Sequence, residues 1–258
     1  MHRIFLERLR QGMRTTDFPL KPAAFPERWR GRPRIDASKC PEGCHACAEA
    51  CPTGAIEWPT GAPRLDLGRC LFCTACVEAC PPGALAYTRD PGLSTRTRED
   101  LVLSGDELRL ATALERRMLS LFGRSLRLRQ VCAGGCNGCE AELVATGNVV
   151  FDLSRFGIQF VASPRHADGI VITGPVTANM RSALLETYEA VPPPRVVIAV
   201  GACAISGGPF VGSAVCNDGV GGLVPVDLYI PGCPPHPITI LDGLLRLLGR
   251  MPAASGPA

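Results

Sequence analysis

The sequence predicts two folded units in one chain, a small α+β module followed by a larger α/β domain. A chain of 258 residues is long enough for both. Residues 39–90 contain an internal repeat, and two copies of one short unit are typical of a pseudo-symmetric module. From about Arg127 onward, short β-rich runs alternate with helical segments, which is the pattern of an α/β domain with a mainly parallel sheet.

The composition favours a folded protein and argues against nucleic acid as a partner. Hydrophobic residues make up 46% of the chain, enough for a sizeable core, and charged residues make up 20%, too few for wholesale disorder. The net charge is only +3. Basic residues gather in residues 1–34, where nine Lys and Arg against three Asp and Glu give this segment a charge of +6.

The 14 cysteines are expected to be metal ligands in a cytoplasmic protein. No apolar stretch reaches the ~18 residues that are needed to cross a bilayer, and the longest, Val196 to Ile205, is expected to be a buried strand. The first residues are charged, so we expect no signal peptide. Because the cytoplasm keeps thiols reduced, disulfides are not the expected use of these cysteines.

The first segment, residues 1–38, is expected to be a basic amphipathic helix and an extended wrap. Apolar residues recur at helical spacing, with arginines elsewhere on the helix: Phe5, Leu6, Leu9 and Met13. Such a helix lies at a membrane surface, in a groove of a partner, or on its own protein. Residues 15–38 are rich in Pro and Arg and show little periodicity, which indicates an extended segment.

Residues 39–95 are expected to form a ferredoxin-like domain with two iron–sulfur clusters. The cysteines of the first unit, Cys44, Cys47 and Cys51, recur 29 positions later as Cys73, Cys76 and Cys80. From Cys70 the second unit follows the C-x2-C-x2-C-x3-C-P spacing of bacterial ferredoxins, in which the fourth thiolate binds the other cluster. The predicted ligands are Cys40, Cys44, Cys47 and Cys80 for cluster 1, and Cys70, Cys73, Cys76 and Cys51 for cluster 2.

The first unit departs from this spacing, because three residues separate Cys40 from Cys44. Gly43 offers a flexible backbone position that could absorb the extra residue. A pair of structural zinc sites is the competing interpretation. Two tight quartets, each closed by Cys-Pro, favour iron–sulfur clusters instead.

A linker helix is expected in residues 96–125. Ser104 and Glu107 have the spacing of a capping box. Four apolar residues then recur on one helical face, before an expected end near Gly123: Leu110, Leu114, Met118 and Leu121. This helix would connect the two folded units.

Residues 126–258 are expected to form an α/β domain of the flavodoxin-like type that carries one 4Fe–4S cluster. The predicted strands are Leu126–Val131, Ile158–Val161, Ile170–Thr173, Val196–Val200 and Val226–Ile230. The predicted helices are Glu140–Thr146, Ala178–Tyr188 and Pro237–Leu248. In such sheets, sites form beyond the carboxyl ends of the strands. Several cysteines follow predicted strands directly, so chemistry is expected at that edge.

The predicted ligands of the third cluster are Cys136, Cys139, Cys203 and Cys233. Their neighbours are Gly, Ala, Ser and Pro, so backbone N–H groups could approach the sulfurs. Cys132 and Cys216 are surplus to four ligands and are interpreted as small buried hydrophobic residues. Cys132 is close enough in sequence to replace one of the four. His45 and His236 are expected to be surface residues.

Residues 126–250 resemble the small subunit of membrane-bound, energy-converting nickel–iron hydrogenases of the formate hydrogenlyase type, and are similar to the B subunit of complex I. The resemblance is carried by Cys136-Asn-Gly-Cys139-Glu140, Arg155-Phe-Gly-Ile158, Ser163-Pro-Arg-His-Ala-Asp168, Thr173-Gly-Pro175, Gly201-Ala-Cys203, and Val224-Pro-Val-Asp227 running into Pro231-Gly-Cys233-Pro-Pro235. Residues 1–95 resemble the ferredoxin-like subunit of the same assemblies. The chain therefore looks like a fusion of two subunits.

One spacing separates the two branches of this resemblance. In the complex I branch, two adjacent cysteines bind the terminal cluster, whereas two residues separate Cys136 from Cys139 here, as in the hydrogenase branch. The hydrogenase interpretation is therefore favoured. The alternative is a complex I-like NADH/quinone oxidoreductase subunit, B-type fused to I-type, that passes electrons to quinone.

The resemblance implies an electron-transfer subunit of a multi-subunit oxidoreductase, not catalytic on its own, with three 4Fe–4S clusters. The nickel–iron centre would lie in a separate large subunit, and the other partners would be membrane-arm subunits and a formate dehydrogenase or ferredoxin as electron donor. The expected location is peripheral, on the cytoplasmic face of the inner membrane. Glu140 could relay protons, or serve only as a carboxylate at a helix N-terminus. His166 is expected at the subunit contact.

Overall fold

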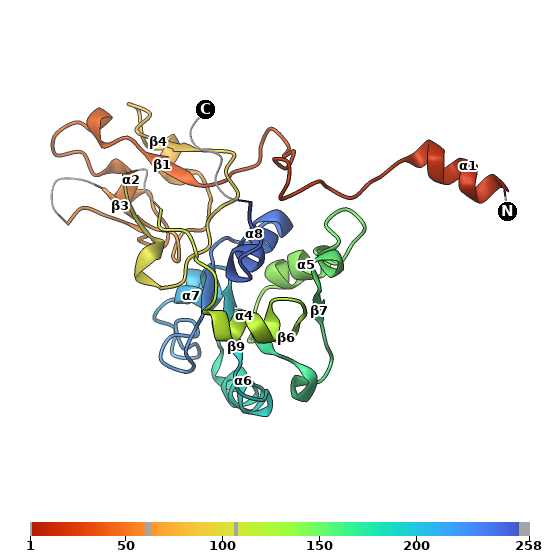
Figure 1. Ribbon diagram of the computed structural model, residues 1–258. Helices are drawn as coiled ribbons and strands as arrows, with labels where there is room; N and C mark the ends of the chain where they lie inside the picture. The colour runs from red at the N-terminus through yellow and green to blue at the C-terminus, as the bar shows by residue number, and fades with distance from the viewer. Residues whose placement is uncertain (1, 60–62, 106–107, 253–258) are drawn as a thin grey trace.

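The computed structural model describes residues 2–59, 63–105 and 108–252. Helix α1 (His2–Gln11) stands away from the body of the protein on an extended segment (Figure 1). The segment joins the body at Thr15 and Thr16, which bond to the Val149 and Val150 carbonyl oxygens, both at 2.8 Å. None of the helices in these described ranges is both long and apolar enough to span a membrane.

The ferredoxin-like module preserves the sequence repeat in its structure. Its short helices, α2 (Ala46–Glu49) and α3 (Ala75–Glu78), have bounds that lie 29 positions apart. Its strands form two small antiparallel sheets. One pairs β1 (Pro33–Ile35) with β4 (Leu85–Tyr87), and the other has the order β2 (Ile56–Glu57), β3 (Arg64–Asp66), β5 (Val102–Ser104). Two 3-10 turns, η1 (Ala37–Lys39) and η2 (Glu99–Leu101), complete the module.

The predicted linker helix is wrong for most of its length. Helix α4 runs only from Arg116 to Phe122. The described residues 108–115 before it belong to no helix, and their backbone groups bond elsewhere, because the Ala111 and Leu114 amides donate to the carbonyl oxygens of Ser94 and Leu247. Ser104 ends β5 rather than capping a helix, and its expected partner Glu107 lies outside the described residues.

The second domain has a five-stranded sheet in which all neighbouring strands are parallel. Its order is β10 (Leu228–Ile230), β9 (Val196–Val200), β8 (Gly169–Thr173), β6 (Leu126–Cys132), β7 (Ile158–Phe160). The predicted strands match these bounds to within two residues, and β9 matches at both ends. Every residue of β8 and β9 is buried, as expected for central parallel strands that are covered on both faces.

The helices of this domain follow the sequence pattern. They are α5 (Gly138–Ala145), α6 (Ala178–Ala190), α7 (Ala202–Ser206) and α8 (Pro237–Leu247), and α7 was not predicted. The 3-10 turns are η3 (Leu153–Phe156), η4 (Pro164–His166) and η5 (Gly208–Phe210). Helix α7 is only five residues long, too short to leave a helical period in the sequence.

Alternate residues along the strands enter two different cores. Val171 belongs to the core that α8 and α5 cover, together with Leu143 and Leu245. Its neighbours Ile170 and Ile172 belong to the other core. That second core continues into the ferredoxin-like module and includes five of its leucines: Leu65, Leu67, Leu85, Leu101 and Leu103. The two units therefore share one hydrophobic core.

Candidate metal centres

Four cysteines lie at the carboxyl edge of the parallel sheet. Cys136 and Cys139 follow β6, Cys203 follows β9, and Cys233 follows β10. Strand β6 lies between β7 and β8, so the chain leaves it at the point where the strand order reverses direction. Ligands of α/β sheets bind at such a switch point. The topology thus brings these four side chains to one edge.

Two of the Cys-x2-Cys pairs share one backbone turn. Thr74 and Asn137, each the first residue after a cysteine, have φ of 73° and 69° and precede helices α3 and α5. The left-handed residue reverses the chain, so that the second cysteine of each pair, Cys76 or Cys139, falls in the first helical turn. The same local geometry therefore serves both units.

Both repeats have a residue with positive φ directly before their second cysteine. The extra residue of the first repeat lies on the N-terminal side of this position. Gly43 and Phe72, each directly before the second cysteine of its unit, have φ of 72° and 54°. A Cβ at Gly43 would meet nothing within 4 Å, so this glycine is there for its backbone conformation rather than for space. The Cys44 amide bonds to the Pro41 carbonyl at 3.2 Å, which closes a turn around the inserted residue.

The four cysteines assigned to cluster 1, which we call quartet 1, surround one cavity. Cys40, Cys44, Cys47 and Cys80 line it together with apolar side chains and Trp58. Burial, followed by the neighbouring Cys80 and Cys44, raises the pKa of the Cys40 thiol. These four sulfurs are thus close enough to feel one another's charge.

The cysteines assigned to cluster 2, which we call quartet 2, are similarly close: Cys51, Cys70, Cys73 and Cys76. Burial, and then Cys76 and Cys51, raises the pKa of Cys70 to about 12. Burial, and then Cys51 and Cys73, raises that of Cys76 to about 11. Backbone N–H groups reach two of the sulfurs, from Ala55 to Cys51 at 3.2 Å and from Phe72 to Cys70 at 3.3 Å.

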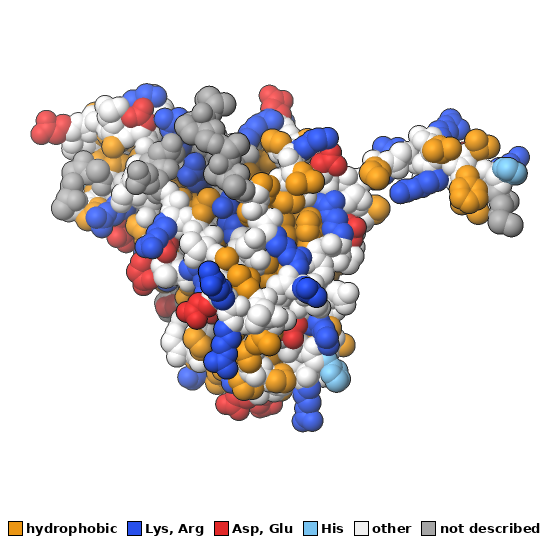
Figure 2. All heavy atoms as spheres, in the orientation of Figure 1, with side chains coloured by type: hydrophobic (Ala, Val, Ile, Leu, Met, Phe, Trp, Pro, Cys, Tyr) orange, Lys and Arg blue, Asp and Glu red, His pale blue; other side chains and the backbone are white. Residues whose placement is uncertain are grey.

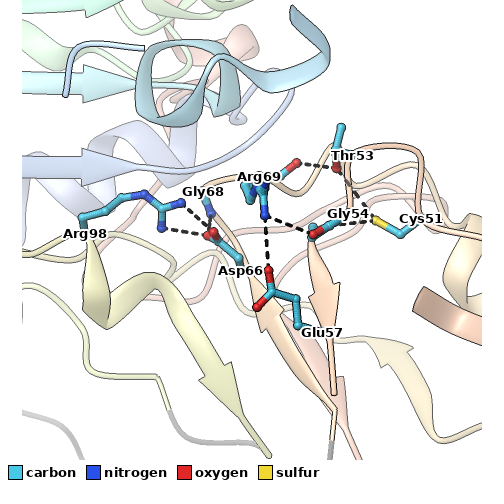
Figure 3. Close-up of polar contacts among 9 residues, drawn as sticks. Cys51, Thr53, Gly54, Glu57, Asp66, Gly68, Arg69 and Arg98 are labelled. Carbon is cyan, nitrogen blue, oxygen red and sulfur yellow. Dashed lines mark hydrogen bonds and ion pairs between the residues drawn. The ribbon is translucent and has the colours of Figure 1, made fainter. Parts of the chain in front are cut away.

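Polar contacts join the segment after Cys51 to Arg69, the residue before Cys70 (Figure 3). Thr53 donates to the Arg69 carbonyl at 2.8 Å, and Arg69 reaches back to the Gly54 carbonyl and to Glu57, both at 3.3 Å. Figure 3 also shows Arg98 facing Asp66 with both of its terminal nitrogens, at 2.8 and 2.5 Å. Asp66 in turn accepts from the Gly68 amide at 2.8 Å, two residues before Cys70.

The cysteines assigned to cluster 3, which we call quartet 3, sit in a cradle of glycines. Burial, and then Cys233 and Cys136, raises the pKa of Cys203 to about 11. Burial, then Glu140 and the other three thiols, raises the pKa of Cys139. A Cβ at Gly201 would lie 2.5 Å from the Cys139 sulfur, and one at Gly208 would lie 3.0 Å from the Cys203 sulfur. Only glycine leaves room beside these sulfurs.

The three quartets are neighbours in series. Cys47 of quartet 1 raises the pKa of Cys76 in quartet 2, and Cys73 of quartet 2 raises the pKa of Cys233 in quartet 3, in each case after larger contributions from burial and from nearer thiols. Electrostatic interaction between two thiols weakens with distance. Contacts between helices α2 and α3, and the groove that Cys73 and Cys233 line together, also make quartet 2 a neighbour of both other quartets.

A groove between quartets 2 and 3 is lined in part by the N-terminal wrap. Cys73 and Cys233 both line this groove, with Trp29, Arg30 and His236. Trp29 meets His236 edge-on, with 6.0 Å between ring centroids. Arg30 donates to the carbonyl oxygen of the residue before Cys73 at 2.6 Å. The predicted extended wrap thus forms one wall of the groove between two predicted metal sites.

The prediction for His236 is wrong, because its side chain is half-buried rather than on the surface. It forms an aromatic group with Trp29, Phe25 and Phe151, and its Nδ1 accepts from the Ile238 amide at 3.1 Å, which caps α8. Burial lowers its pKa. A lone histidine after Pro-Pro gives no sequence signal for this contact.

The remaining singled-out residues lie around quartet 3. The interpretation of Cys132 and Cys216 as buried small hydrophobic residues is wrong, because Cys132 is exposed and Cys216 is only half-buried. Cys132 ends β6 and interacts with Glu140, and the backbone of Cys216 forms an isolated β-bridge with Thr177. Glu140 accepts from Thr173 at 2.6 Å through Oε1, and its buried Oε2 has no hydrogen-bond partner among the described residues. Burial acts to raise the pKa of Glu140, but hydrogen bonds from Thr173 and Cys132 outweigh it and the pKa is lowered.

Glu142 and His166 lie in different surroundings. Glu142 lines the groove between quartets 2 and 3, where burial raises its pKa. His166 is exposed in η4. Among residues 2–59, 63–105 and 108–252, no three His, Cys, Asp or Glu side chains are grouped closely enough to hold a single metal ion.

The contact between Asp66 and Arg98 is expected to matter for stability. Replacing Arg98 with Met leaves the Asp66 carboxylate, whose side chain is 18% exposed, without its cation. Loss of such charge-assisted hydrogen bonds should lower the free energy of unfolding by about 2 kcal/mol, measured by denaturant unfolding. Arg109→Met is the control, because Arg109 is 83% exposed and 3.8 Å from Asp100, and no measurable change is expected there. Equal losses in both variants would contradict the prediction.

Comparison with known families agrees with this architecture. Residues 32–81 match the 4Fe-4S dicluster domain, and residues 136–247 match the family described as NADH ubiquinone oxidoreductase, 20 Kd subunit. The chain is 41% identical over 141 residues to the probable membrane-bound hydrogenase subunit mbhJ of Pyrococcus furiosus, covering 54% of this chain and 84% of that one. It is 45% identical over 120 residues to the B subunit of NADH-quinone oxidoreductase from Heliobacterium modesticaldum, covering 46% and 69%.

A further relative is formate hydrogenlyase subunit 7 of Escherichia coli, which is 45% identical over 139 residues. That match covers 54% of each chain, so it spans only about half of that relative's length. Among solved structures, a chain of an archaeal membrane-bound sulfane sulfur reductase has 32% identity and a TM-score of 0.46, covering 56% of this chain and 80% of that one. The resemblance that the motifs predicted is confirmed. This chain belongs to the NADH ubiquinone oxidoreductase 20 kDa subunit family, and carries a 4Fe–4S ferredoxin-like domain ahead of that subunit, as an iron–sulfur electron-transfer component of hydrogenase-like and complex I-like oxidoreductases.

Proposed function

We propose that this chain is the electron-transfer subunit of a membrane-associated nickel–iron hydrogenase of the formate hydrogenlyase type. It would relay electrons between the active site of a large subunit and a donor, through three 4Fe–4S clusters held by quartets 1, 2 and 3. The observation that carries the proposal is the serial arrangement of the quartets. Helices α2 and α3, which carry Cys47 and Cys76, contact each other across the first gap, and Cys73 and Cys233 line one groove across the second.

The residues of each quartet suit a 4Fe–4S cluster. Quartet 1 encloses a cavity with apolar walls. Quartet 2 receives backbone N–H groups at two sulfurs, and such donors are typical of the surroundings of cluster thiolates. Quartet 3 is flanked by Gly201 and Gly208, where a side chain would collide with sulfur. When bound, each cluster supplies one-electron chemistry, and the protein's part is to fix spacing and surroundings.

The exposure of quartet 3 supports its place next to the large subunit. Cys136 and Cys233 are exposed, whereas Cys40, Cys44 and Cys80 of quartet 1 are half-buried and Cys47 is buried. The nickel–iron centre would lie beyond quartet 3, with the donor at the other end of the chain of clusters. Glu140, next to Cys139, holds a free carboxylate oxygen there and is the proposed proton relay.

A complex I-like protein that passes electrons to quinone is the second candidate. One observation supports this candidate, and another supports the hydrogenase. Relatives named as B subunits of NADH-quinone oxidoreductase match this chain, as do hydrogenase subunits. The two residues between Cys136 and Cys139, one of them the left-handed Asn137, favour the hydrogenase branch.

The proposed domains are the helix and wrap of residues 1–38, the two-cluster domain of residues 39–95, the connection of residues 96–125 and the α/β domain of residues 126–258. Strands β1 and β5 lie outside residues 39–95 but pair with strands of the two-cluster domain, so its sheets extend into both flanking segments. The strand order of the last domain, 2-1-3-4-5 along the sequence, supports the flavodoxin-like description. The proposed partners are the large subunit, membrane-arm subunits, and a formate dehydrogenase or ferredoxin as donor.

Helix α1 supports a peripheral position on the cytoplasmic face of the inner membrane. Its residues are all exposed, including Ile4, Phe5 and Leu9 at 72%, 67% and 79%. Figure 2 shows hydrophobic and basic side chains together on this helix, away from the rest of the protein. An exposed apolar stripe beside arginines fits the surface of an anionic bilayer.

Metal analysis and turnover test the main proposal. Anaerobically isolated protein should contain about twelve irons and twelve sulfides for three cubanes. The assembled complex should evolve or consume hydrogen and contain nickel. Iron-free protein, or bound zinc in place of iron, would contradict the electron-transfer function. Quinone reduction by a nickel-free complex would instead favour the second candidate.

Gly201→Ala should remove iron selectively from quartet 3. The new Cβ would lie 2.5 Å from the Cys139 sulfur, at a φ of 89° that favours glycine. We expect loss of about one cubane, four of twelve irons, by iron analysis. Gly222→Ala is the matched control, because its φ is 75° but nothing lies within 4 Å of the added Cβ. Full iron in G201A, or equal losses in both variants, would argue against quartet 3.

Removing residues 1–14 should release the protein from anionic vesicles. The truncation leaves the anchor at Thr15 and Thr16 intact. A smaller change, Arg8→Gln with Arg10→Gln, should weaken binding by about 1 kcal/mol per charge in co-sedimentation. Glu7→Gln is the control and should bind at least as tightly as the wild type. Undiminished binding of the truncated protein would rule out a membrane role for α1.

A further inference from the structure

The two repeats of the ferredoxin-like module carry an aromatic residue with a polar hydrogen at the same position. Trp58 and Tyr87 lie 29 positions apart, each seven residues after the last cysteine of its repeat, Cys51 or Cys80. Tyr87 is the last residue of β4, and Trp58 directly follows the equivalent strand β2. The repeat therefore places the two side chains in equivalent surroundings.

The Trp58 side chain is part of the wall of the cavity that quartet 1 surrounds. The side chain lines the same cavity as Cys40, Cys44, Cys47 and Cys80. Its Nε1 is buried and has no partner that satisfies hydrogen-bond geometry among the described residues. The indole N–H is nevertheless near enough to the Cys47 sulfur to act on that thiol and oppose the rise of its pKa by burial.

Tyr87 has the equivalent relation to quartet 2. Its hydroxyl is near enough to the Cys70 sulfur to act on that thiol and oppose the rise of its pKa by burial. Its ring lies beside that of Phe72, with 6.0 Å between centroids, and the Phe72 amide donates to the same sulfur at 3.3 Å. The Cys70 sulfur thus has one backbone donor and a tyrosine hydroxyl nearby, and a substitution can remove the hydroxyl cleanly.

We propose that Trp58 and Tyr87 are matched hydrogen-bond donors, one to each ferredoxin cluster, and that each raises the reduction potential of its own cluster. The inference rests on the proposed function, because it takes quartets 1 and 2 as cluster sites. Reduction adds one electron to a cluster, forms and breaks no bond, and leaves the donor's proton in place. A donor to a cluster sulfur stabilises the more negative, reduced state and so favours reduction.

The pairing also explains how one repeated unit can give two different clusters. An indole N–H and a phenol O–H differ in length and strength as donors to sulfur. Replacement of one by the other at the equivalent position sets the two potentials apart without altering a ligand. Trp58 and Tyr87 are therefore positioning residues, which act on the cluster through a cysteine sulfur.

The experiment is a redox titration of full-length, anaerobically isolated protein, followed by electron paramagnetic resonance. Trp58→Phe removes the indole N–H, and Tyr87→Phe removes only the hydroxyl. Each variant should lower the ratio of reduced to oxidised form of its own cluster about tenfold at a fixed potential, a shift of 59 mV for one electron. The other cluster should keep its potential, which makes each variant an internal control for the other.

Tyr188→Phe is the matched control, because it removes a hydroxyl from a tyrosine of α6 that belongs to none of the three quartets. It should leave both potentials unchanged. Should Trp58→Phe lose iron, a second measurement uses the Trp29→Phe variant, which keeps Trp58 as its one tryptophan, labelled with ¹⁵N at the indole nitrogen. A nitrogen coupling to the reduced quartet 1 cluster is then expected in the electron paramagnetic resonance spectrum.

The outcomes separate this inference from the proposed function. Wild-type protein without iron would overturn the proposed function, and this inference with it. Fully loaded variants with wild-type potentials, equal shifts of both clusters in one variant, or a missing nitrogen coupling would overturn this inference alone. Selective shifts, each confined to one cluster, would support it.

Discussion

The spacing of the three quartets depends on the single hydrophobic core that the two folded units share. Leu67 and Leu101 are fully buried in the ferredoxin-like module and pack in the same core as Ile205 of α7. At this joint Ser206 donates to the Gly68 carbonyl at 2.8 Å, and a Cβ on Gly68 would lie 2.8 Å from Ile205. A close-packed interior does not slide, so the loops that carry Cys70 and Cys203 keep a fixed separation. The fusion therefore acts through packing as well as through the covalent link.

Because the thiols are buried, binding of the proposed clusters is coupled to thiol deprotonation and to the stability of the folded protein. Burial and neighbouring thiols raise the pKa of Cys70 to about 12 and those of Cys76 and Cys203 to about 11. Without metal these thiols stay protonated at neutral pH, and iron binding has to displace their protons. The positive iron then offsets both the desolvation and the mutual repulsion of the thiolates. Because burial disfavours thiolates in the metal-free protein, the cysteines are expected to be deprotonated only when metal is bound.

The sequence predicted those parts of the fold that local rules determine. Strand β9 and the start of α8 follow from continuous apolar residues and from a proline at the first helical turn. The order of cysteines in the repeat follows from spacing alone. The conformation of the linker and the contact partners of the wrap could not be predicted, because tertiary contacts determine them. Leu114 has helical spacing with its neighbours, yet its amide is taken by Leu247, and Arg30 finds its partner 42 residues away.

The inserted residue before Cys44 shows why repeat symmetry in the sequence does not guarantee equal sites. Helices α2 and α3 stay in register, and the kink before the second cysteine is left-handed in both units. The insertion is therefore absorbed between Cys40 and Gly43, by the turn that Pro41 closes, and it displaces only the first ligand. What differs between the units is the surroundings of the sulfurs, where the first offers Trp58 and the second offers Tyr87. Ligand geometry is the symmetric part of the module, and its hydrogen bonds are the part free to vary.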